Sequence, residues 1–207
     1  MRTILAAAAI IAAGPAVAEP VTIVALGNSL TAGYQLGPGE GFPAQLEAHL
    51  RSEGYDVTVT DAGVSGDTTS GGRSRLDWSV GPEADGVILA LGGNDALRGL
   101  PPETTRQNLT AMLDRLDERG IPVLLAGMLA PPNLGEDYGK EFAAIYADLA
   151  KERDIIFYPF FLEGVAADPA FNLADGIHPT AEGITVIVGN MLPYAKDLVE
   201  RAIAAQD

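Results

Sequence analysis

Three residues of this sequence have the chemistry and the spacing of a nucleophile with its supporting base and acid. Ser29 lies in Gly27-Asn28-Ser29-Leu30, directly after a short apolar run. Asp175 and His178 lie three positions apart in Asp175-Gly176-Ile177-His178-Pro179. A histidine can take the proton of a serine hydroxyl, and a carboxylate can orient the imidazole and stabilise its cation. The pattern therefore favours nucleophilic catalysis by Ser29, with His178 as base and Asp175 as its partner.

The histidine count supports this assignment. The sequence contains 2 histidines, and His49 lies among charged residues in a helical stretch, where we expect an exposed side chain. His178 is thus almost the sole candidate for a base. Each short block is also typical of an ordinary turn, because Asn and Ser are common turn residues and a loop histidine can simply cap the last helix.

Two further residues could stabilise negative charge on a substrate oxygen. Gly66 follows a predicted strand, and a glycine N–H is accessible to a closely approaching ligand. Asn94 follows Gly92-Gly93 after another predicted strand, and its side chain supplies an amide donor. Preorganised donors of this kind form an oxyanion hole. By itself, the Gly92-Gly93-Asn94-Asp95 block is equally typical of a turn.

Motifs for other chemistries are absent from the sequence. Thr31 occupies the place of the second glycine in a Gly-x-Ser-x-Gly elbow, and there is no Walker loop. The glycines at positions 37, 39 and 41 lack the spacing of a dinucleotide fingerprint. The chain has no cysteine and no histidine cluster, which argues against thiolate and catalytic metal sites. We expect neither a metal nor a cofactor.

The elements that must position these residues alternate along the chain. Apolar runs over residues 21–26, 57–61, 86–91, 122–126 and 155–158 predict five buried strands. Stretches over 42–53, 69–78, 103–118, 140–153 and 180–204 predict helices. The alternation favours an α/β fold with a five-stranded parallel sheet covered on both faces. The carboxyl ends of parallel strands share one edge, so Ser29, Gly66 and Asn94 should cluster there.

The longest irregular stretch that the sequence predicts is residues 128–139. It contains Met128, Pro131 and Asn133, and a loop of this length in a compact domain is often a binding loop. We expect these three residues to belong to a substrate loop. No segment has the pattern of a separate lid.

The first 18 residues match a cleaved secretory signal peptide. Arg2 precedes an apolar core over residues 4–13, and Ala16-Val17-Ala18 forms a small-x-small cleavage site. Residues 19–207 then suit a single domain of ordinary size. We expect a periplasmic or secreted protein without a stable membrane anchor, with an uncleaved N-terminal anchor as the alternative.

The charge balance restricts the partners. With 28 acidic and 13 basic residues, the formal net charge is -15. Such a chain repels nucleic acid and anionic lipid headgroups. The charge favours neutral or cationic partners, and we expect no nucleic-acid partner, while the oligomeric state stays open.

Taken together, the blocks around Ser29, Gly66, Asn94 and His178 resemble, in order and spacing, those of the SGNH or GDSL-type hydrolases. The resemblance runs from Val21 to about Tyr194. Ser65-Gly66-Asp67-Thr68 and Leu91-Gly92-Gly93-Asn94-Asp95 also resemble the periplasmic branch of thioesterases, arylesterases and lysophospholipases.

The resemblance implies a flavodoxin-like three-layer α/β/α sandwich. It implies Ser29 as nucleophile, Asp175 and His178 as the rest of the triad, and Ser29, Gly66 and Asn94 as the oxyanion hole. One residue departs from the family pattern, because Asn28 stands where an aspartate is usual. The amide keeps an acceptor for local turn bonds but removes a charge beside the nucleophile. We expect altered loop stability or pH dependence.

The expected activity is hydrolysis of short- to medium-chain acyl or aryl esters through an acyl-enzyme, with thioesters and lysophospholipids as further family substrates. A carbohydrate O-acetylesterase of the same fold is an alternative, less favoured because the chain has a single tryptophan and sugar platforms use aromatic residues. A non-catalytic periplasmic binding domain is the alternative from another class. It would make the joint occurrence of the five site residues a coincidence.

Overall fold

The computed structural model describes residues 20–206, which contain one five-stranded parallel sheet. Its strands are β1 (Val21–Gly27), β2 (Val57–Gly63), β3 (Gly86–Ala90), β4 (Val123–Ala126) and β5 (Ile156–Tyr158). They lie in the order β2-β1-β3-β4-β5, and every neighbouring pair is parallel. This is the flavodoxin-like order, so the predicted fold class is confirmed.

The strand order reverses between β1 and β3. The chain leaves β1 towards β2 on one side and leaves β3 towards β4 on the other. Loops that follow two such strands diverge and leave a crevice at the carboxyl edge of the sheet. Ser29 comes directly after β1, and Asn94 comes shortly after β3.

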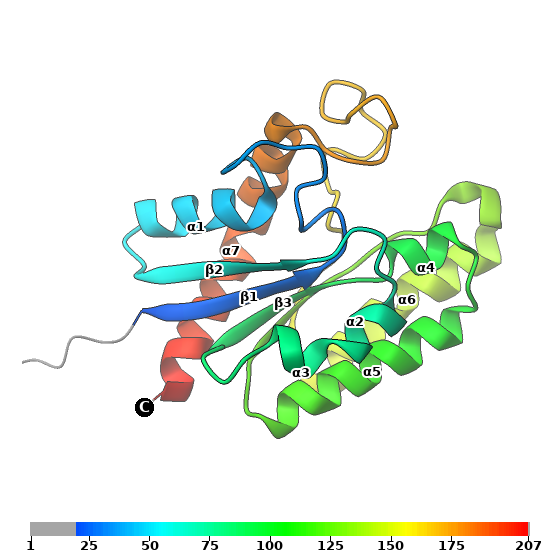
Figure 1. The fold of residues 1–207 in the computed structure, drawn as a ribbon. Helices are drawn as coiled ribbons and strands as arrows, with labels where there is room; N and C mark the ends of the chain where they lie inside the picture. The colour runs from blue at the N-terminus through cyan, green and yellow to red at the C-terminus, as the bar shows by residue number, and fades with distance from the viewer. Residues whose placement is uncertain (1–19, 207) are drawn as a thin grey trace, which may run out of the picture.

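Helices form a layer on each face of the sheet, as Figure 1 shows. On one face, α1 (Phe42–Ser52) packs against the long α7 (Ala181–Gln206). The other helices are α2 (Thr69–Ser74), α3 (Leu76–Ser79), α4 (Gly93–Leu97), α5 (Pro102–Glu118) and α6 (Glu136–Arg153). The three predicted layers are therefore present.

The core explains why the strand sequences are continuous apolar runs. All five residues of β3 and all four of β4 are buried. A strand with helices over both faces has no side facing water, so the usual alternation of apolar and polar residues disappears.

Two helical predictions differ from the structure. The stretch 69–78 forms α2 and α3, because Arg75 between them leaves the helical region at φ -109 and ψ 7. The Gly92-Gly93-Asn94-Asp95 block is not a plain loop. Gly92 has φ 113, and it allows the chain to turn directly into α4 with Asn94 in the first turn.

The prediction of the longest irregular stretch is wrong. Residues 128–139 are shortened by a 3-10 turn, η1 (Pro132–Leu134), and by α6, which starts at Glu136 rather than Lys140. The longer segment is 159–180, which extends beyond the carboxyl edge of the sheet (Figure 1). It is held by scattered turn bonds, such as Val165 N–H to the Leu162 carbonyl at 3.0 Å, which leave no periodic signal in a sequence.

The predicted signal peptide, residues 1–18, lies outside the described residues. Within residues 20–206, none of the helices has both the length and the apolar character that crossing a bilayer requires.

Gly92 gives a direct test of how tightly the site is supported. A Cβ at this position would overlap the hydroxyl of the fully buried Tyr146, and φ 113 is strained for any other residue. We expect Gly92→Ala to cost about 2–5 kcal/mol of unfolding free energy. Gly189 is the matched control, because it lies mid-helix in α7 with open space around it.

Gly189→Ala should stabilise the protein by about 0.5–1 kcal/mol. Urea denaturation of both variants measures the two effects. A Gly92→Ala protein as stable as the parent would show that the packing around Tyr146 yields at little cost.

Candidate active site

The turn after β1 presents the Ser29 side chain. The Asn28 carbonyl accepts hydrogen bonds from the N–H groups of Thr31 at 3.2 Å and Ala32 at 3.0 Å. The Asn28 Oδ1 atom accepts one from Leu30 at 3.0 Å. Asn28 is 2% exposed, so this bonding is buried beneath the serine. Both the backbone carbonyl and the side chain of Asn28 therefore stabilise the turn that carries Ser29.

Ser29, His178 and Asp175 form a continuous line of hydrogen-bonding atoms. His178 Nε2 lies 2.9 Å from Ser29 Oγ, and His178 Nδ1 lies 2.7 Å from Asp175 Oδ2. The other histidine, His49, is half-buried in α1 rather than exposed, with Nδ1 2.9 Å from the Gln45 carbonyl. It is not among the residues that line the cavity described below.

The Asp175 carboxylate is fixed by its own loop. Its Oδ1 accepts the N–H groups of His178 at 3.0 Å and Ile177 at 2.9 Å. These two backbone donors, with the His178 ring, lower the pKa of Asp175 from 3.8 to about 2. Gly176, at φ 68, provides the tight turn that brings the carboxylate back onto the imidazole. Asp175 is therefore ionised beside His178 throughout the neutral range.

The predicted oxyanion donors lie near one another but are placed differently. Asn94 lines the cavity beside Ser29, and one of its Nδ2 hydrogens binds the Asp67 carbonyl at 2.8 Å. Gly66 precedes Asp67, has φ 84 and is exposed, and it is not among the residues that line the cavity. Its carbonyl accepts a hydrogen bond from Arg98 at 2.7 Å. Within residues 20–206, neither the Ser29 N–H nor the Gly66 N–H has a hydrogen-bond acceptor.

Two charged residues that sequence reasoning missed hold these loops together. Asp95 is fully buried and accepts hydrogen bonds from Thr69 N–H at 2.8 Å and Thr69 Oγ1 at 2.5 Å. It thereby joins the start of α4 to the start of α2. Arg75 binds the Gly27 carbonyl at 2.8 Å and Asp67 Oδ2 at 2.6 Å. It thereby joins the end of β1 to the Gly66 loop.

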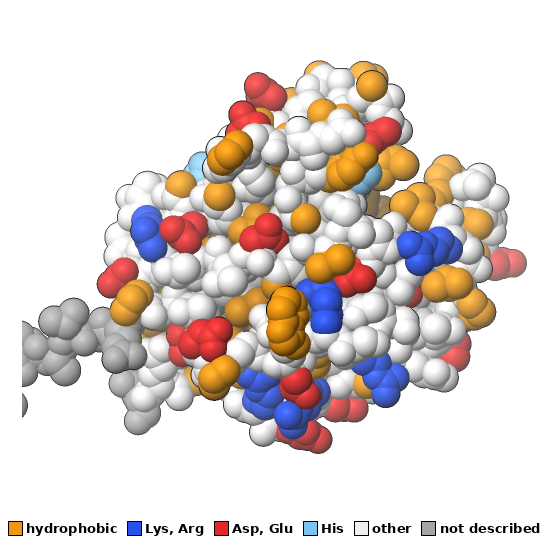
Figure 2. Space-filling view, viewed as in Figure 1, with side chains coloured by type: hydrophobic (Ala, Val, Ile, Leu, Met, Phe, Trp, Pro, Cys, Tyr) orange, Lys and Arg blue, Asp and Glu red, His pale blue; other side chains and the backbone are white. Residues whose placement is uncertain are grey.

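Ser29 and His178 open into a cavity of about 410 Å³ that is mostly apolar. Of the three predicted loop residues, Met128 and Pro131 line it, whereas Asn133 lies exposed in η1 and does not. The 159–180 segment, which sequence reasoning overlooked, supplies a large share of the wall through Phe160, Leu162, Ala166, Ala167, Asn172, Gly176 and Ile177. Figure 2 shows hydrophobic side chains gathered around a hollow between this segment and the rest of the body.

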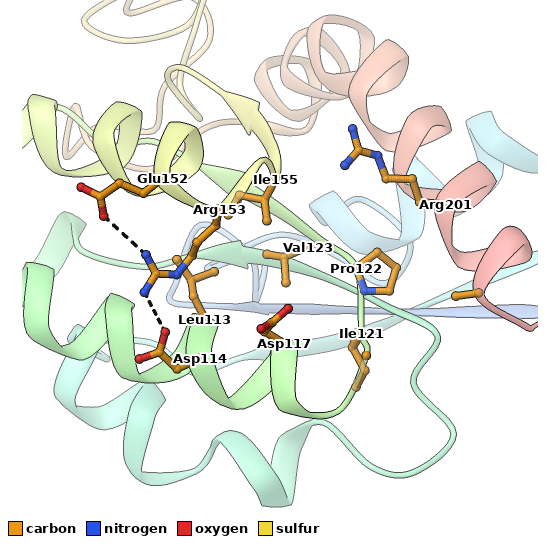
Figure 3. Close-up of a pocket in the computed structure, with 12 residues that line it drawn as sticks. Leu113, Asp114, Asp117, Ile121, Pro122, Val123, Glu152, Arg153, Ile155 and Arg201 are labelled. Atoms are coloured by element: carbon orange, nitrogen blue, oxygen red, sulfur yellow. Dashed lines mark hydrogen bonds and ion pairs between the residues drawn. The ribbon is translucent and has the colours of Figure 1, made fainter.

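A larger hollow of about 580 Å³ lies at the opposite edge of the sheet, where β4 and β5 begin. Figure 3 shows Arg153 at its side, paired with Asp114 at 2.7 Å and with Glu152 at 3.5 Å. It contains neither a serine nor a histidine, so it has no candidate nucleophile or base. No group of three or more metal-ligating side chains occurs within residues 20–206.

A serine hydroxyl, an imidazole and an ionised carboxylate in line, at the carboxyl edge of a doubly covered parallel sheet, define the class of α/β serine hydrolases. Residues 25–185 match the model of the "GDSL-like Lipase/Acylhydrolase family". The chain belongs to this family, as its motifs predicted, and it is a carboxylic ester hydrolase.

Individual relatives agree with this conclusion. Esterase TesA of Pseudomonas aeruginosa is 38% identical over 86% of this chain and 89% of its own length. Thioesterase 1/protease 1/lysophospholipase L1 of Escherichia coli is 36% identical over 86% of this chain and 85% of its own length. The crystal structure of AlinE4, an SGNH-hydrolase family esterase, is 46% identical, covers 87% of this chain and 97% of that one, and superposes with a TM-score of 0.74. The carbohydrate esterase and binding-domain alternatives are not favoured.

Asn28 can be tested through the pH dependence of stability. In Asn28→Asp the new carboxyl would be buried, and burial raises a carboxyl pKa above about 3.9, its value in an unfolded chain. The Leu30 N–H that now binds Asn28 Oδ1 would offset only part of this rise, because Arg75 binds the neighbouring Gly27 carbonyl and not the Asn28 side chain. The folded variant should then bind more protons than the unfolded one, so its stability relative to the parent should fall as pH rises from about 4 to about 8.

Thermal melts of both proteins across this range measure the effect. If the melting temperatures of the two proteins change with pH in the same way, and the pH profile of hydrolysis is unchanged, the amide at this position has no special role.

Proposed function

We propose that Ser29, His178 and Asp175 are the catalytic triad of this esterase. The 2.9 Å distance from His178 Nε2 to Ser29 Oγ is the observation that carries the proposal. His178 takes the hydroxyl proton as Ser29 attacks the acyl carbon, and Asp175 keeps the imidazole oriented and stabilises the imidazolium. His178 then protonates the departing alcohol. Water, activated by the same imidazole, hydrolyses the acyl-enzyme.

We propose the Ser29 N–H, the Gly66 N–H and the Asn94 amide as the oxyanion hole. An amide NH₂ has two donors, and Asn94 uses one of them on the Asp67 carbonyl at 2.8 Å. The second is free to meet the substrate oxygen. The Ser29 and Gly66 N–H groups likewise have no hydrogen-bond acceptor within residues 20–206. Donors that are already in place and have no other acceptor can stabilise the negative charge of the transition state without any rearrangement of the protein.

The preferred substrates, we propose, are short- to medium-chain acyl or aryl esters. The cavity beside Ser29 is apolar and carries no Asp, Glu, Lys or Arg, which suits an acyl or aryl group. Thioesters and lysophospholipids are further candidates, because a relative carries both activities in its name. Met128 and Pro131 on one wall and Phe160 and Leu162 on the other would set the chain length accepted.

We propose that the enzyme acts outside the cytoplasm, as a single domain over residues 19–207. The support is the sequence pattern of residues 1–18, with Arg2, the apolar core and the Ala16-Val17-Ala18 site. The first strand begins at Val21, shortly after the expected cleavage point.

The triad assignment is tested by Ser29→Ala. Without the nucleophile, kcat for a nitrophenyl ester should fall roughly a thousandfold or more. A fluorophosphonate probe should label the parent protein on Ser29 and leave the variant unlabelled. Ser52→Ala, at an exposed serine at the end of α1, is the matched control and should behave as the parent does. Near-parental turnover by Ser29→Ala would overturn the assignment.

The acyl-chain assignment is tested with esters of rising length. Each added methylene that the cavity buries contributes about 0.8 kcal/mol, so kcat/KM should rise roughly fourfold per methylene until the wall is reached. Leu129, on the cavity wall and 51% exposed, can be replaced without disturbing the core. Leu129→Ser should lower kcat/KM for longer esters about three- to tenfold and leave acetate esters nearly unchanged.

Ile203→Ser is the matched control, since Ile203 is 45% exposed on α7 and is not among the cavity-lining residues. A flat response to chain length would contradict the proposal. So would a uniform loss on all esters in Leu129→Ser.

A further inference from the structure

The aromatic ring of Tyr34 packs against the imidazole of His178. The two ring centroids lie 4.4 Å apart, and the planes are tilted by 38°. Tyr34 is 39% exposed, and its hydroxyl has no hydrogen-bond partner within residues 20–206. The contact with His178 is therefore made by the ring and not by the hydroxyl.

The backbone of the same residue binds the nucleophile's own peptide. The Tyr34 N–H donates to the Ser29 carbonyl at 3.1 Å. Tyr34 is thus attached to Ser29 through its backbone and to His178 through its ring, although Ser29 and His178 are 149 positions apart.

The local conformation that aims this ring is strained. Gly33 and Gln35, on either side of Tyr34, have φ values of 66 and 60. Gln35 carries a side chain, so the left-handed region is unfavourable for it, and such strain persists where the surroundings hold it. Gly33 also lies against Gly41, the residue before α1. The turn around Tyr34 therefore combines a glycine that suits positive φ with a strained Gln35 that the surroundings hold in place.

Gln45 connects the Tyr34 loop to the segment that carries His178. Its Nε2 donates to the Glu40 carbonyl at 2.9 Å and to the Ala181 carbonyl at 3.0 Å. Its Oε1 accepts from Thr185 Oγ1 at 2.8 Å. Ala181 begins α7, three positions after His178. The two loops are thus held in register by a side chain outside the cavity.

We propose that Tyr34 is a positioning residue for the His178 base, with its ring holding the imidazole in line with Ser29. The ring covers one face of the imidazole and restricts its tilt, so Nε2 stays directed at Ser29 Oγ. When His178 takes the serine proton, the cation forms beside an aromatic ring at a distance that permits cation–π attraction. Tyr34 is not among the cavity-lining residues, so its effect runs through His178 and not through the acyl group.

The proposal rests on the proposed triad, and Tyr34→Phe, Tyr34→Leu and Trp78→Leu test it. Tyr34→Leu removes the ring, and kcat should fall about tenfold while KM changes less than twofold, because both positioning and cation–π attraction act on the proton transfer and not on substrate binding. Tyr34→Phe keeps the ring and should retain more than half of the parental kcat. Trp78→Leu, at an aromatic residue that is 85% exposed on α3, should match the parent.

A spectroscopic signature separates positioning from general destabilisation. The proton between His178 Nδ1 and Asp175 Oδ2 should give a downfield NMR signal in the parent and in Tyr34→Phe. In Tyr34→Leu we expect it to broaden by exchange with water, while the melting temperature stays near the parental value. If Tyr34→Leu does not fold, Tyr34→Met, which is flexible and lacks a ring, takes its place with the same expectations.

Parental kcat in the ring-less variant would overturn the proposal. A change confined to KM would also do so, as would a loss in Tyr34→Phe equal to that in Tyr34→Leu. These results are distinct from a failure of the triad itself, in which Ser29→Ala would stay active. An inactive Ser29→Ala with a fully active Tyr34→Leu refutes the role of Tyr34 alone.

Discussion

The contact between His178 Nε2 and Ser29 Oγ joins two positions 149 residues apart, and most of the fold is needed to keep it at 2.9 Å. Neither side chain belongs to a strand or a helix. Ser29 is fixed by the end of β1, one of the two strands that flank the point where the strand order reverses. His178 is fixed by the start of α7, whose buried face runs along the sheet beside α1. The geometry of these two loops therefore depends on the packing of the α1 and α7 layer against the sheet.

The buried and partly buried polar residues around the site help to hold Ser29 and His178 in place. Loops cannot bury enough apolar surface to hold themselves rigid, so their backbone groups must find specific partners. Asp95 supplies acceptors to Thr69, and Arg75 supplies donors to Gly27 and Asp67. Removing one partner of such a buried bond leaves the other unsatisfied, which costs more than the bond itself contributes. The loops after β1, β2 and β3 are therefore bonded to one another.

Much of this arrangement could be predicted from the sequence, because the relevant signals are local or compositional. Five apolar runs predicted five strands, and the position of Ser29 and Asn94 after two of them predicted a shared edge. The Asp175–His178 pairing follows from a spacing of three residues across a glycine. Asp95 and Arg75 were missed because their partners lie 26 and 48 residues away, and no periodicity marks them. The 159–180 segment was missed because its turns have no repeating pattern, and Asn133 was expected in the cavity although the 3-10 turn at Pro132 leaves it exposed.

The charge distribution bears on the proposed substrate range as well as the fold does. The chain has a formal net charge of -15, yet the cavity beside Ser29 is lined by no Asp, Glu, Lys or Arg. The acidic groups therefore act at long range, where they repel anionic molecules before these reach the site. Uncharged esters meet no such barrier, and their acyl chains gain from the apolar wall once inside. A polyanionic thioester would have to overcome the repulsion with local contacts, and Arg98, close to the site, is already bonded to the Gly66 carbonyl. This balance is the physical reason why the proposed substrate range puts neutral acyl and aryl esters ahead of anionic carriers of the same acyl group.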